Sequence, residues 1–506
     1  MDSQTVDARY DELQRKLEPL WKSIGAMNED EQTIVVVPSI TLDATADWGN
    51  AMQMFEERFL FLLLLLRQPR ARLIYVTSTT VHPSIIDYYL NLLPGVIPSH
   101  ARARLQMVAP MDGSPRPLSI KLLERPRLLE KIRSLIPDPE RAHLVPYNTT
   151  EFERDLALAL GIPMYGADPR HFHHGTKTGC RRLFEEEGVA HPLGAEDLHS
   201  EGDVIEAIGK IRSARPEVTR VIVKLNEGIS GLGNAVVDLN GLPPTGASDD
   251  RGQVVERIRG MQFESDKLSY EEYMTSMSAK GGIVEEFLGG EEVRSPSVQL
   301  RVTPLGVLEI LSTHDQLLGG PSGQSYLGCK FPADRAYAEM ITREAEKVGM
   351  RLAKEGVLGR FALDFLVVKN GASEWEAYAI EINLRKGGTT HPFLTLQFLT
   401  DGNYDPSTGI FTAPSGIEKF FVASDHVELE SLRGLTPDDL FDIVIRHRLH
   451  FDQSRQTGVV FHMMSGLGEF GRVGLTAVED SREGAEALYE RAVRILEEEA
   501  ETSYAP

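Results

Sequence analysis

The sequence predicts a multidomain protein of mixed α/β and α+β class, and three observations support this. The 506 residues suffice for about three domains at a typical size of about 150 residues each. Residues 1–165 alternate β-like and helix-like stretches, which is typical of an α/β layer. From residue 166 onward, short strand-like runs follow one another across glycine turns, which favours antiparallel pairing. We therefore predict an N-terminal α/β domain (1–165), a central core (166–395) and a mixed C-terminal domain (396–506).

The N-terminal elements follow from residue type and periodicity. β-branched residues predict strands at 33–37 and 73–77, with a weaker candidate at 105–109. Longer patterns predict helices at 55–66 and 84–93.

The later elements are mostly strands. The predicted strands cover 221–224, 234–238, 283–288, 297–302, 308–313, 361–368 and 378–383. Helices are predicted at 178–187, at 333–355 and, in the C-terminal domain, at 485–499. The stretch 241–252 is rich in Gly, Pro, Ser and Asp and is the best linker candidate.

The composition is that of a folded protein and excludes several classes. Apolar residues make up 42% and charged residues 25%, so disorder and collagen-like structure are excluded. The formal net charge of −22 predicts no nucleic-acid partner bound by bulk electrostatics. Cys180 and Cys329 form no CxxC, which argues against a disulfide framework or a zinc site and favours a reducing compartment.

No segment resembles a membrane span or a secretory signal. The longest apolar run, 59–66, is bordered by Arg58 and Arg67 and is far shorter than the roughly 20 residues that cross a bilayer. The start of the chain, Met1–Gln4, is polar and acidic. We expect a cytoplasmic protein with no membrane partner, and the sequence does not indicate an oligomeric state.

A lysine followed by a glycine-rich loop suggests a phosphate site. Lys224 ends a predicted strand, and Gly228, Gly231 and Gly233 follow it. Glycines let backbone N–H groups approach phosphate oxygens, and the lysine adds positive charge. The chain then returns to a β pattern, whereas a dinucleotide-binding fingerprint needs a helix there, and no GxxxxGK[ST] motif occurs. The alternative interpretation is an ordinary glycine turn.

A second lysine, Lys177, stands at the amino end of the helix predicted at 178–187. The positive end of the helix dipole disfavours a lysine at this position, unless an anion binds both the lysine and the helix terminus. A solvated surface lysine is the alternative. His171, His173 and His174 lie just upstream, and we favour a polar loop over a metal site because no matching carboxylate or cysteine cluster stands nearby.

A predicted hairpin places acidic side chains together. Strand alternation puts Glu381 and Asn383 on one face and Ile380 on the other. Folding the chain after Asn370-Gly371 brings Asp364 opposite Glu381. Like charges across a ladder destabilise it, whereas Mg²⁺ binds such oxygen ligands while sharing phosphate oxygens. An exposed polar face is the alternative, but the flanking residues are apolar.

A fourth element, 284–292, is a strand that ends in a glycine turn. Its backbone groups, Leu288 and a carboxylate could contact a base and a ribose. Taken alone, it is indistinguishable from an acidic surface hairpin.

In order along the chain, these elements resemble the ATP-grasp carboxylate–amine ligases over about 166–395. More narrowly, the chain resembles the pheganomycin-type peptide ligases, through residues 312–316, 323–330, 391–402 and 457–463. The resemblance implies an ATP-grasp fold with an N-terminal pre-ATP-grasp domain and a C-terminal extension.

The resemblance also implies ATP and Mg²⁺ as cofactors and assigns roles to single residues. The implied ATP-binding residues are Lys177, Lys224, Gly228, Ser230, Gly231, Gly233, Glu285, Glu286, Leu288 and Glu292. Asp364, Glu381 and Asn383 would hold the metal, and Arg385 and Lys386 would be catalytic. The candidate substrate contacts are Arg301, His314 and Asp315.

The sequence departs from the family pattern at one position. Many D-alanine-type ligases carry an arginine two residues before the metal aspartate, where this chain has Ala362. The missing charge could come from Arg385, Lys386 or Arg360.

The implied reaction is ligation of a small-molecule carboxylate to an amino-acid or peptide amine through an acylphosphate, with release of ADP and phosphate. Two lysines, Mg²⁺ and an arginine would offset the repulsion between carboxylate and phosphate. Water must be excluded, so we expect a lid at the glycine loop and at 319–323. The alternatives are an ATP-grasp enzyme with another acceptor, of kinase or carboxylase type, and a non-catalytic nucleotide-binding module.

Overall fold

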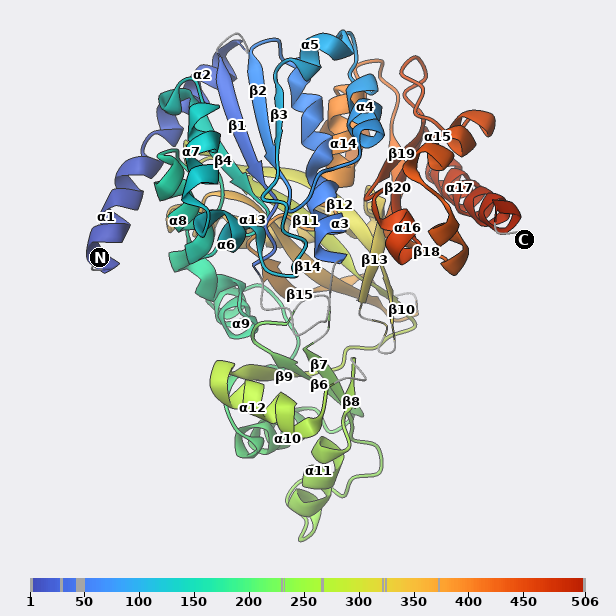
Figure 1. The fold of residues 1–506 in the computed structure, drawn as a ribbon. Helices are drawn as coiled ribbons and strands as arrows, with labels where there is room; N and C mark the ends of the chain where they lie inside the picture. The colour runs from blue at the N-terminus through green and yellow to red at the C-terminus, as the bar shows by residue number, and fades with distance from the viewer. Residues whose placement is uncertain are drawn as a thin grey trace.

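The computed structural model describes residues 3–27, 31–41, 51–228, 231, 233–264, 268–320, 323, 325–371 and 374–503. An N-terminal α/β layer and the C-terminal elements lie side by side above a large sheet, and a smaller lobe hangs below it (Figure 1). The mixed α/β and α+β class predicted from the sequence is confirmed.

The N-terminal layer is built on a four-stranded parallel sheet with strand order β3-β2-β1-β4. Its strands are β1 (Gln32–Val37), β2 (Ala71–Val76), β3 (Leu105–Val108) and β4 (Ala142–Pro146). Its helices are α1 (Ser3–Gln14), α2 (Leu17–Met27), α3 (Ala51–Glu56), the 3₁₀ segments η1 (Glu57–Arg67) and η2 (Pro139–Arg141), α4 (Pro83–Asn91), α5 (Pro98–Arg102), α6 (Leu118–Leu123), α7 (Pro126–Ser134) and α8 (Glu151–Leu160). The apolar run predicted as one helix is therefore divided between α3 and η1, and most of it is buried.

The small lobe carries an antiparallel sheet of order β5-β9-β6-β7-β8. Its strands are β5 (Gly194–Leu198), β6 (Arg220–Leu225), β7 (Asn234–Asp238), β8 (Gln262–Phe263) and β9 (Gly282–Glu286). The helices α10 (Glu201–Ala214), α11 (Asp250–Arg259) and α12 (Tyr270–Lys280) belong to this lobe. A separate hydrophobic cluster fills it, so the lobe has its own core.

A nine-stranded sheet forms the centre, in the order β10-β14-β11-β12-β13-β18-β20-β19, with β15 paired to β14. Its strands are β10 (Glu292–Arg294), β11 (Pro296–Val302), β12 (Leu308–Gly319), β13 (Ser325–Phe331), β14 (Gly359–Lys369), β15 (Glu376–Asn383), β18 (Phe420–Glu428), β19 (Gly458–His462) and β20 (Arg472–Glu479). Because β13 pairs with β18, the sheet runs without interruption across the boundary predicted at 395. The three domain ranges stay a prediction.

Helices and short strands complete the central and C-terminal parts. They are η3 (Pro169–Gly175), α9 (Lys177–Glu186), α13 (Arg335–Lys354), α14 (Thr390–Thr400), β16 (Asn403–Asp405), β17 (Ile410–Thr412), η4 (Glu430–Gly434), α15 (Pro437–Arg446), α16 (Gly466–Phe470) and α17 (Arg482–Ser503). Helix α13 follows the predicted amphipathic pattern, and its buried face includes Tyr337, Ile341 and Leu352. Within the described residues, none of the helices combines the length and the apolar character needed to span a membrane.

Candidate active site between the two sheets

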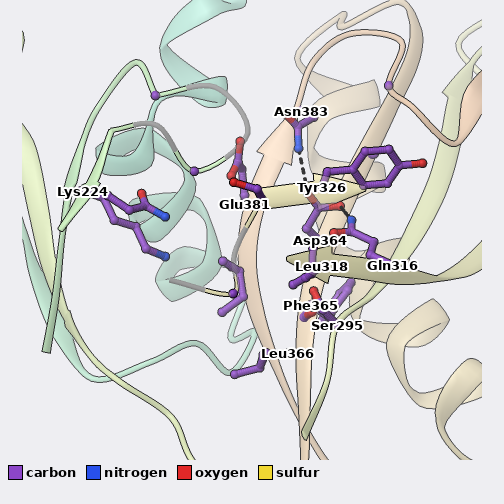
Figure 2. Close-up of a pocket in the computed structure, with 18 of the residues that line it drawn as sticks. Lys224, Ser295, Gln316, Leu318, Tyr326, Asp364, Phe365, Leu366, Glu381 and Asn383 are labelled. Carbon is purple, nitrogen blue, oxygen red and sulfur yellow. Dashed lines mark hydrogen bonds between the residues drawn. The ribbon is translucent and has the colours of Figure 1, made fainter. Parts of the chain in front are cut away.

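A cavity of about 920 Å³ lies where the small lobe meets the nine-stranded sheet. Strands β6 and β9 supply residues from the lobe, and β12, β14 and β15 supply residues from the large sheet. The N-terminal layer also reaches it through Arg58 and Tyr147. Figure 2 shows Lys224 on one side and Asp364, Glu381 and Asn383 on the other.

The carboxylates of the predicted hairpin meet in this cavity. Asp364 and Glu381 are direct partners in the β14–β15 ladder, so the predicted register is confirmed. Asn383 Nδ2 donates to Asp364 Oδ2 (3.0 Å), and Gln316 Nε2 donates to Asp364 Oδ1 (2.8 Å) (Figure 2). The set holds two carboxylates and one side-chain amide, which are hard oxygen donors suited to Mg²⁺. The residues present therefore fit such an ion.

The two carboxyl groups differ in proton affinity. Burial, followed by the nearby Glu381 charge, raises the pKa of Asp364 to about 7. Burial also acts to raise the pKa of Glu381, but Lys177 and Arg385 outweigh it, so that this pKa lies below its usual value. Without a cation, the pair therefore keeps the charge on Glu381 and favours a proton on Asp364.

A β-bulge modifies the predicted alternation of β15. Asp364 opposes Glu381, but the next pair is Phe365 with Ala379, so Ile380 is the extra residue. The sequence placed Ile380 on the face away from Glu381, and this was wrong, because both side chains line the cavity. Strict alternation holds only in an unbulged strand.

Lys177 is the first residue of α9, as the sequence predicted. Thr176 caps this helix by accepting from Gly179 N (3.0 Å), and Asn226 Oδ1 accepts from Thr178 N (3.0 Å). The buried Lys177 ammonium lies 2.6 Å from Glu381 Oε2. Helix α9 thus aims a cation at the metal-ligand candidates.

Lys224 lies across the cavity, near the end of β6. Its ammonium forms an ion pair with Glu285 Oε1, and Arg181 lies 3.4 Å from the other oxygen of that carboxylate. All three side chains are about 95% buried or more. The basic groups expected to contact phosphate are thus paired with carboxylates, which balances charge in a low-dielectric site.

The glycine loop after Lys224 brings two backbone segments close together. A Cβ on Gly228 would lie 3.2 Å from Gly233 Cα, and Gly231 has a φ of +83°. Both features favour glycine. Gly228 and Gly231 line the cavity, whereas Gly233 lies behind them, and Ser230 falls outside the described residues.

The remaining walls are of two kinds. One part is apolar and is formed by Ile222, Phe287, Leu288, Leu318, Leu366 and Ile380. The other residues are polar and include Arg58, Arg294, Arg385, His426, Tyr147 and Tyr326. The sequence analysis selected only Leu288 and Arg385 from these groups. One sequence signal could have singled out Arg58, because this charged residue stands directly before the apolar run 59–66.

Several predicted residues are engaged elsewhere. Lys386 Nζ donates to Pro146 O (2.6 Å), and burial, followed by Arg360, lowers its pKa to about 7. Arg301 pairs with Glu309. The residues that line the cavity include none of Lys386, Arg301, His314 and Glu292.

Three acidic residues named in the sequence analysis do reach the cavity. Glu285 is held by Lys224, whereas Glu286 Oε1 accepts from Leu193 N (2.8 Å). Asp315 lines the cavity, and its Oδ1 accepts from Tyr337 Oη (2.6 Å). These carboxylates therefore already have partners within the chain.

The upstream histidines have a carboxylate neighbour that sequence reasoning missed. His174 Nε2 lies 2.5 Å from Glu355 Oε2, and ligand atoms of His171, His174 and Glu355 all lie within 4.8 Å of one another. The argument that no matching carboxylate stands nearby was wrong, because α13 brings Glu355 from a distant part of the chain. Glu355 also accepts from Arg351 Nε (2.5 Å), so ion pairing accounts for its position.

Comparisons with known proteins identify the family. A family model described as "IQCH-like, ATP-grasp" matches residues 171–259 and 253–407, and one described as "PGM1 C-terminal domain" matches residues 439–492. L-propargylglycine–L-glutamate ligase from Streptantibioticus cattleyicolor is 30% identical over 94% of this chain and 97% of its own length. IQ motif-containing protein H from Danio rerio is 22% identical over 95% of this chain, which spans about half (49%) of that relative.

Solved structures agree on the fold. An ADP complex of N5-carboxyaminoimidazole ribonucleotide synthetase has a TM-score of 0.52 at 11% identity, covering 92% of this chain and 97% of its own. Biotin carboxylase from Campylobacter jejuni has a TM-score of 0.53 at 12% identity, covering 94% and 96%. The predicted fold is thereby confirmed, and together with the ligase relative these matches show that the chain belongs to the ATP-grasp family of ATP-dependent carboxylate–amine ligases.

Proposed function

We propose that this enzyme joins the carboxylate of an amino acid to the amine of a second amino acid or a peptide, through an acylphosphate. The observation that carries the proposal is the pair Asp364 and Glu381, with Lys177 beside Glu381 and Lys224 across the same cavity. Such an arrangement suits a triphosphate held between cations and a metal ion.

The nucleotide fits the cavity in one orientation. The apolar walls, which include Ile222, Leu288 and Leu366, suit the adenine base. The triphosphate would then extend toward Lys177 and Lys224, with the glycine loop above it. The resemblance assigns the ribose to Glu292, which does not itself line the cavity, although its neighbour Val293 does.

Asp364, Glu381 and the Asn383 amide oxygen would hold Mg²⁺. When bound, the ion would offset phosphate charge and orient the γ-phosphoryl group. Lys177 now neutralises Glu381 at 2.6 Å. Once a cation neutralises that carboxylate, the Lys177 ammonium is available to a phosphate oxygen, so nucleotide and metal would support each other's binding.

Chemistry would take place at the end of the cavity that holds Arg385, near the Asp364–Glu381 pair. The substrate carboxylate attacks the γ-phosphorus, ADP leaves, and the amine then displaces phosphate from the acyl carbon and loses a proton. Arg385 lines this end, with its NH1 3.4 Å from Tyr147 Oη, and is our candidate for holding the transferred phosphoryl group. Lys386 faces away from the cavity, so Arg385 supports the role better.

The amino-acid substrate class rests on the relative and on charge. The ligase from Streptantibioticus cattleyicolor is named for two amino acids. In this chain, Arg294 and Arg385 line the cavity, and a guanidinium group binds a carboxylate through paired hydrogen bonds. Amino acids bring carboxylates that such groups can bind.

ADP release and product mass provide the test. The purified enzyme is supplied with Mg-ATP and pairs drawn from a mixture of amino acids and short peptides. We expect ADP release that needs both a carboxylate and an amine donor, with one amide product per ADP. Release with a single acceptor would instead indicate a kinase-type or carboxylase-type enzyme, and the absence of release with all pairs would indicate a binding module.

A matched pair of lysine variants ties the result to the site. Lys224→Ala should abolish ADP release while thermal unfolding stays cooperative. Lys347 is a surface lysine of α13 that pairs with Glu344, and Lys347→Ala should retain full activity. Full activity in Lys224→Ala would refute the proposed phosphate contact.

A further inference from the structure

Three side chains with metal-binding atoms meet inside the protein, away from the Asp364–Glu381 pair. His391 lies in the first turn of α14, Asp425 in β18, and His462 at the end of β19. Each is at most 3% exposed. We call these three residues the His–Asp–His cluster.

The ligand atoms of the cluster converge on one point. His462 Nε2 lies 2.7 Å from Asp425 Oδ1, His391 Nε2 lies 3.3 Å from the same oxygen, and the two Nε2 atoms are 3.0 Å apart. Three atoms with these separations lie on a circle of radius about 1.75 Å. An ion about 2.0–2.1 Å from each atom, the usual distance for zinc, would therefore sit about 1 Å out of their plane, with the three ligands on one side of it.

At a separation of 3.0 Å, the Nε2 atoms of the two histidines cannot both carry a proton. A neutral imidazole at His391 carries one N–H. If that proton is on Nε2 and His462 also donates to Asp425, two N–H groups lie 3.0 Å apart. An ion bound to both Nε2 atoms would remove this repulsive contact. The His391 proton would then lie on Nδ1, which has no hydrogen-bond partner among the described residues, so the bound state bears the cost of that unpaired donor.

An arginine of the N-terminal layer occupies one oxygen of the Asp425 carboxylate. Arg58 NH2 lies 2.7 Å from Asp425 Oδ2, which leaves Oδ1 for the two histidines. An ion pair to the second oxygen of a ligand carboxylate is a common outer-shell arrangement.

A glycine makes room for the His462 ring. A Cβ on Gly474, the β20 partner of His462, would overlap the imidazole. The ring therefore lies directly against the β20 backbone, and its Nε2 is directed at His391 and Asp425 rather than at a side chain of that strand. The local backbone is thus shaped around this histidine.

We propose that the His–Asp–His cluster binds one divalent first-row transition-metal ion, with Zn²⁺ as the preferred occupant. Two imidazole nitrogens and one carboxylate oxygen suit such an ion, whereas Mg²⁺ requires oxygen ligands. The scarcity of cysteine argued against a zinc site in the sequence, but this cluster uses none. It is therefore chemically distinct from the Asp364–Glu381 site.

The ion would hold together the elements that form one wall of the cavity. Thr389, two residues before His391, lines the cavity, as do His426, next to Asp425, and Arg58. The ion would join α14, β18 and β19, which are distant in sequence. Its role is structural, since the three ligand residues do not themselves line the cavity.

Metal binding by the full chain tests this directly. The protein is stripped with a chelator, transferred to buffer containing excess Mg²⁺, and titrated with Co²⁺ and, separately, with Zn²⁺. We expect about one ion per chain, visible Co²⁺ absorption that saturates at that ratio, and a rise in melting temperature with Zn²⁺ that additional Mg²⁺ does not reproduce. Absence of Co²⁺ and Zn²⁺ binding by the wild-type chain would overturn the proposal.

Variants locate the ion. His391→Ala and His462→Ala should lose the stoichiometric ion. His143 in β4 is another buried histidine whose Nδ1 is unpartnered among the described residues, and His143→Ala should keep it. Unchanged stoichiometry in both cluster variants would place the metal elsewhere and refute the site. If either variant fails to fold, the wild-type Co²⁺ titration still decides the question, because it needs no substitution.

Discussion

Asp364→Asn should stabilise the metal-free enzyme while removing its activity. Wild-type Asp364 has a pKa raised to about 7 by burial and by Glu381. An aspartate with a raised folded-state pKa binds its proton more tightly in the folded protein than in the unfolded chain. The wild type therefore loses stability as pH rises from about 4 through about 7, and an asparagine, which does not ionise, avoids this loss.

The magnitude follows from the shift and from the lost hydrogen bond. A rise from 3.8 to about 7 corresponds to about 4 kcal/mol above pH 8, at 1.36 kcal/mol per unit. The carboxylate accepts from both Gln316 (2.8 Å) and Asn383 (3.0 Å), and an amide can accept only through its oxygen, which costs about 1 kcal/mol. We expect a net gain of about 2–3 kcal/mol at pH 8 and almost none at pH 4.

Urea unfolding without Mg²⁺ at pH 4 and pH 8 measures this difference. Asp250→Asn is a control with the opposite expected sign. Arg212 outweighs burial and lowers the pKa of Asp250, so loss of the Asp250 carboxylate should destabilise the small lobe at pH 8. Mg-ATP should raise the melting temperature of the wild type but not of Asp364→Asn. An Asp364→Asn enzyme that is less stable than the wild type at pH 8 would refute the account of the carboxylate pair.

Three further predictions concern neighbouring positions. Lys177→Met should lower kcat/KM for ATP about 100-fold or more, measured by ADP release, because a cation aimed at the phosphates is lost. Lys386 has a pKa lowered to about 7 by burial, so the folded protein gains stability as pH rises from about 7 to about 10, and Lys386→Met should flatten that rise in urea unfolding. Gly388→Ala should cost about 1–3 kcal/mol, because its Cβ would overlap the Tyr326 ring, whereas Gly387→Ala meets nothing within 4 Å and should unfold like the wild type.

Local sequence patterns were sufficient for the elements that carry the reaction. Strand periodicity and one Asn-Gly turn correctly placed Asp364 opposite Glu381, because register in a hairpin is set by nearby residues. Lys177 was found at the start of its helix for the same reason, since Thr176 and the following apolar pattern are local signals. The bulge at Ile380 was missed, because a single inserted residue leaves the β pattern almost unchanged.

Local sequence patterns could not predict contacts between residues far apart in the chain. Glu355 reaches His174 from the end of α13, and Arg58 reaches Asp425 from the N-terminal layer. Neither pair shares a local motif, and each depends on how the layers pack. Arg301 and Lys386 were chosen by resemblance and do not line the cavity. Arg301 pairs with Glu309, and Lys386 donates to a backbone carbonyl.

Oxygen transfer tests the central claim most directly. The enzyme is supplied with Mg-ATP, an amine and a carboxylate substrate labelled with ¹⁸O. Attack of the carboxylate on the γ-phosphorus predicts one ¹⁸O atom in each phosphate released, in equal amount to ADP and amide, with none of this transfer in Lys224→Ala. Label appearing in AMP, or unlabelled phosphate formed alongside the amide, would contradict it.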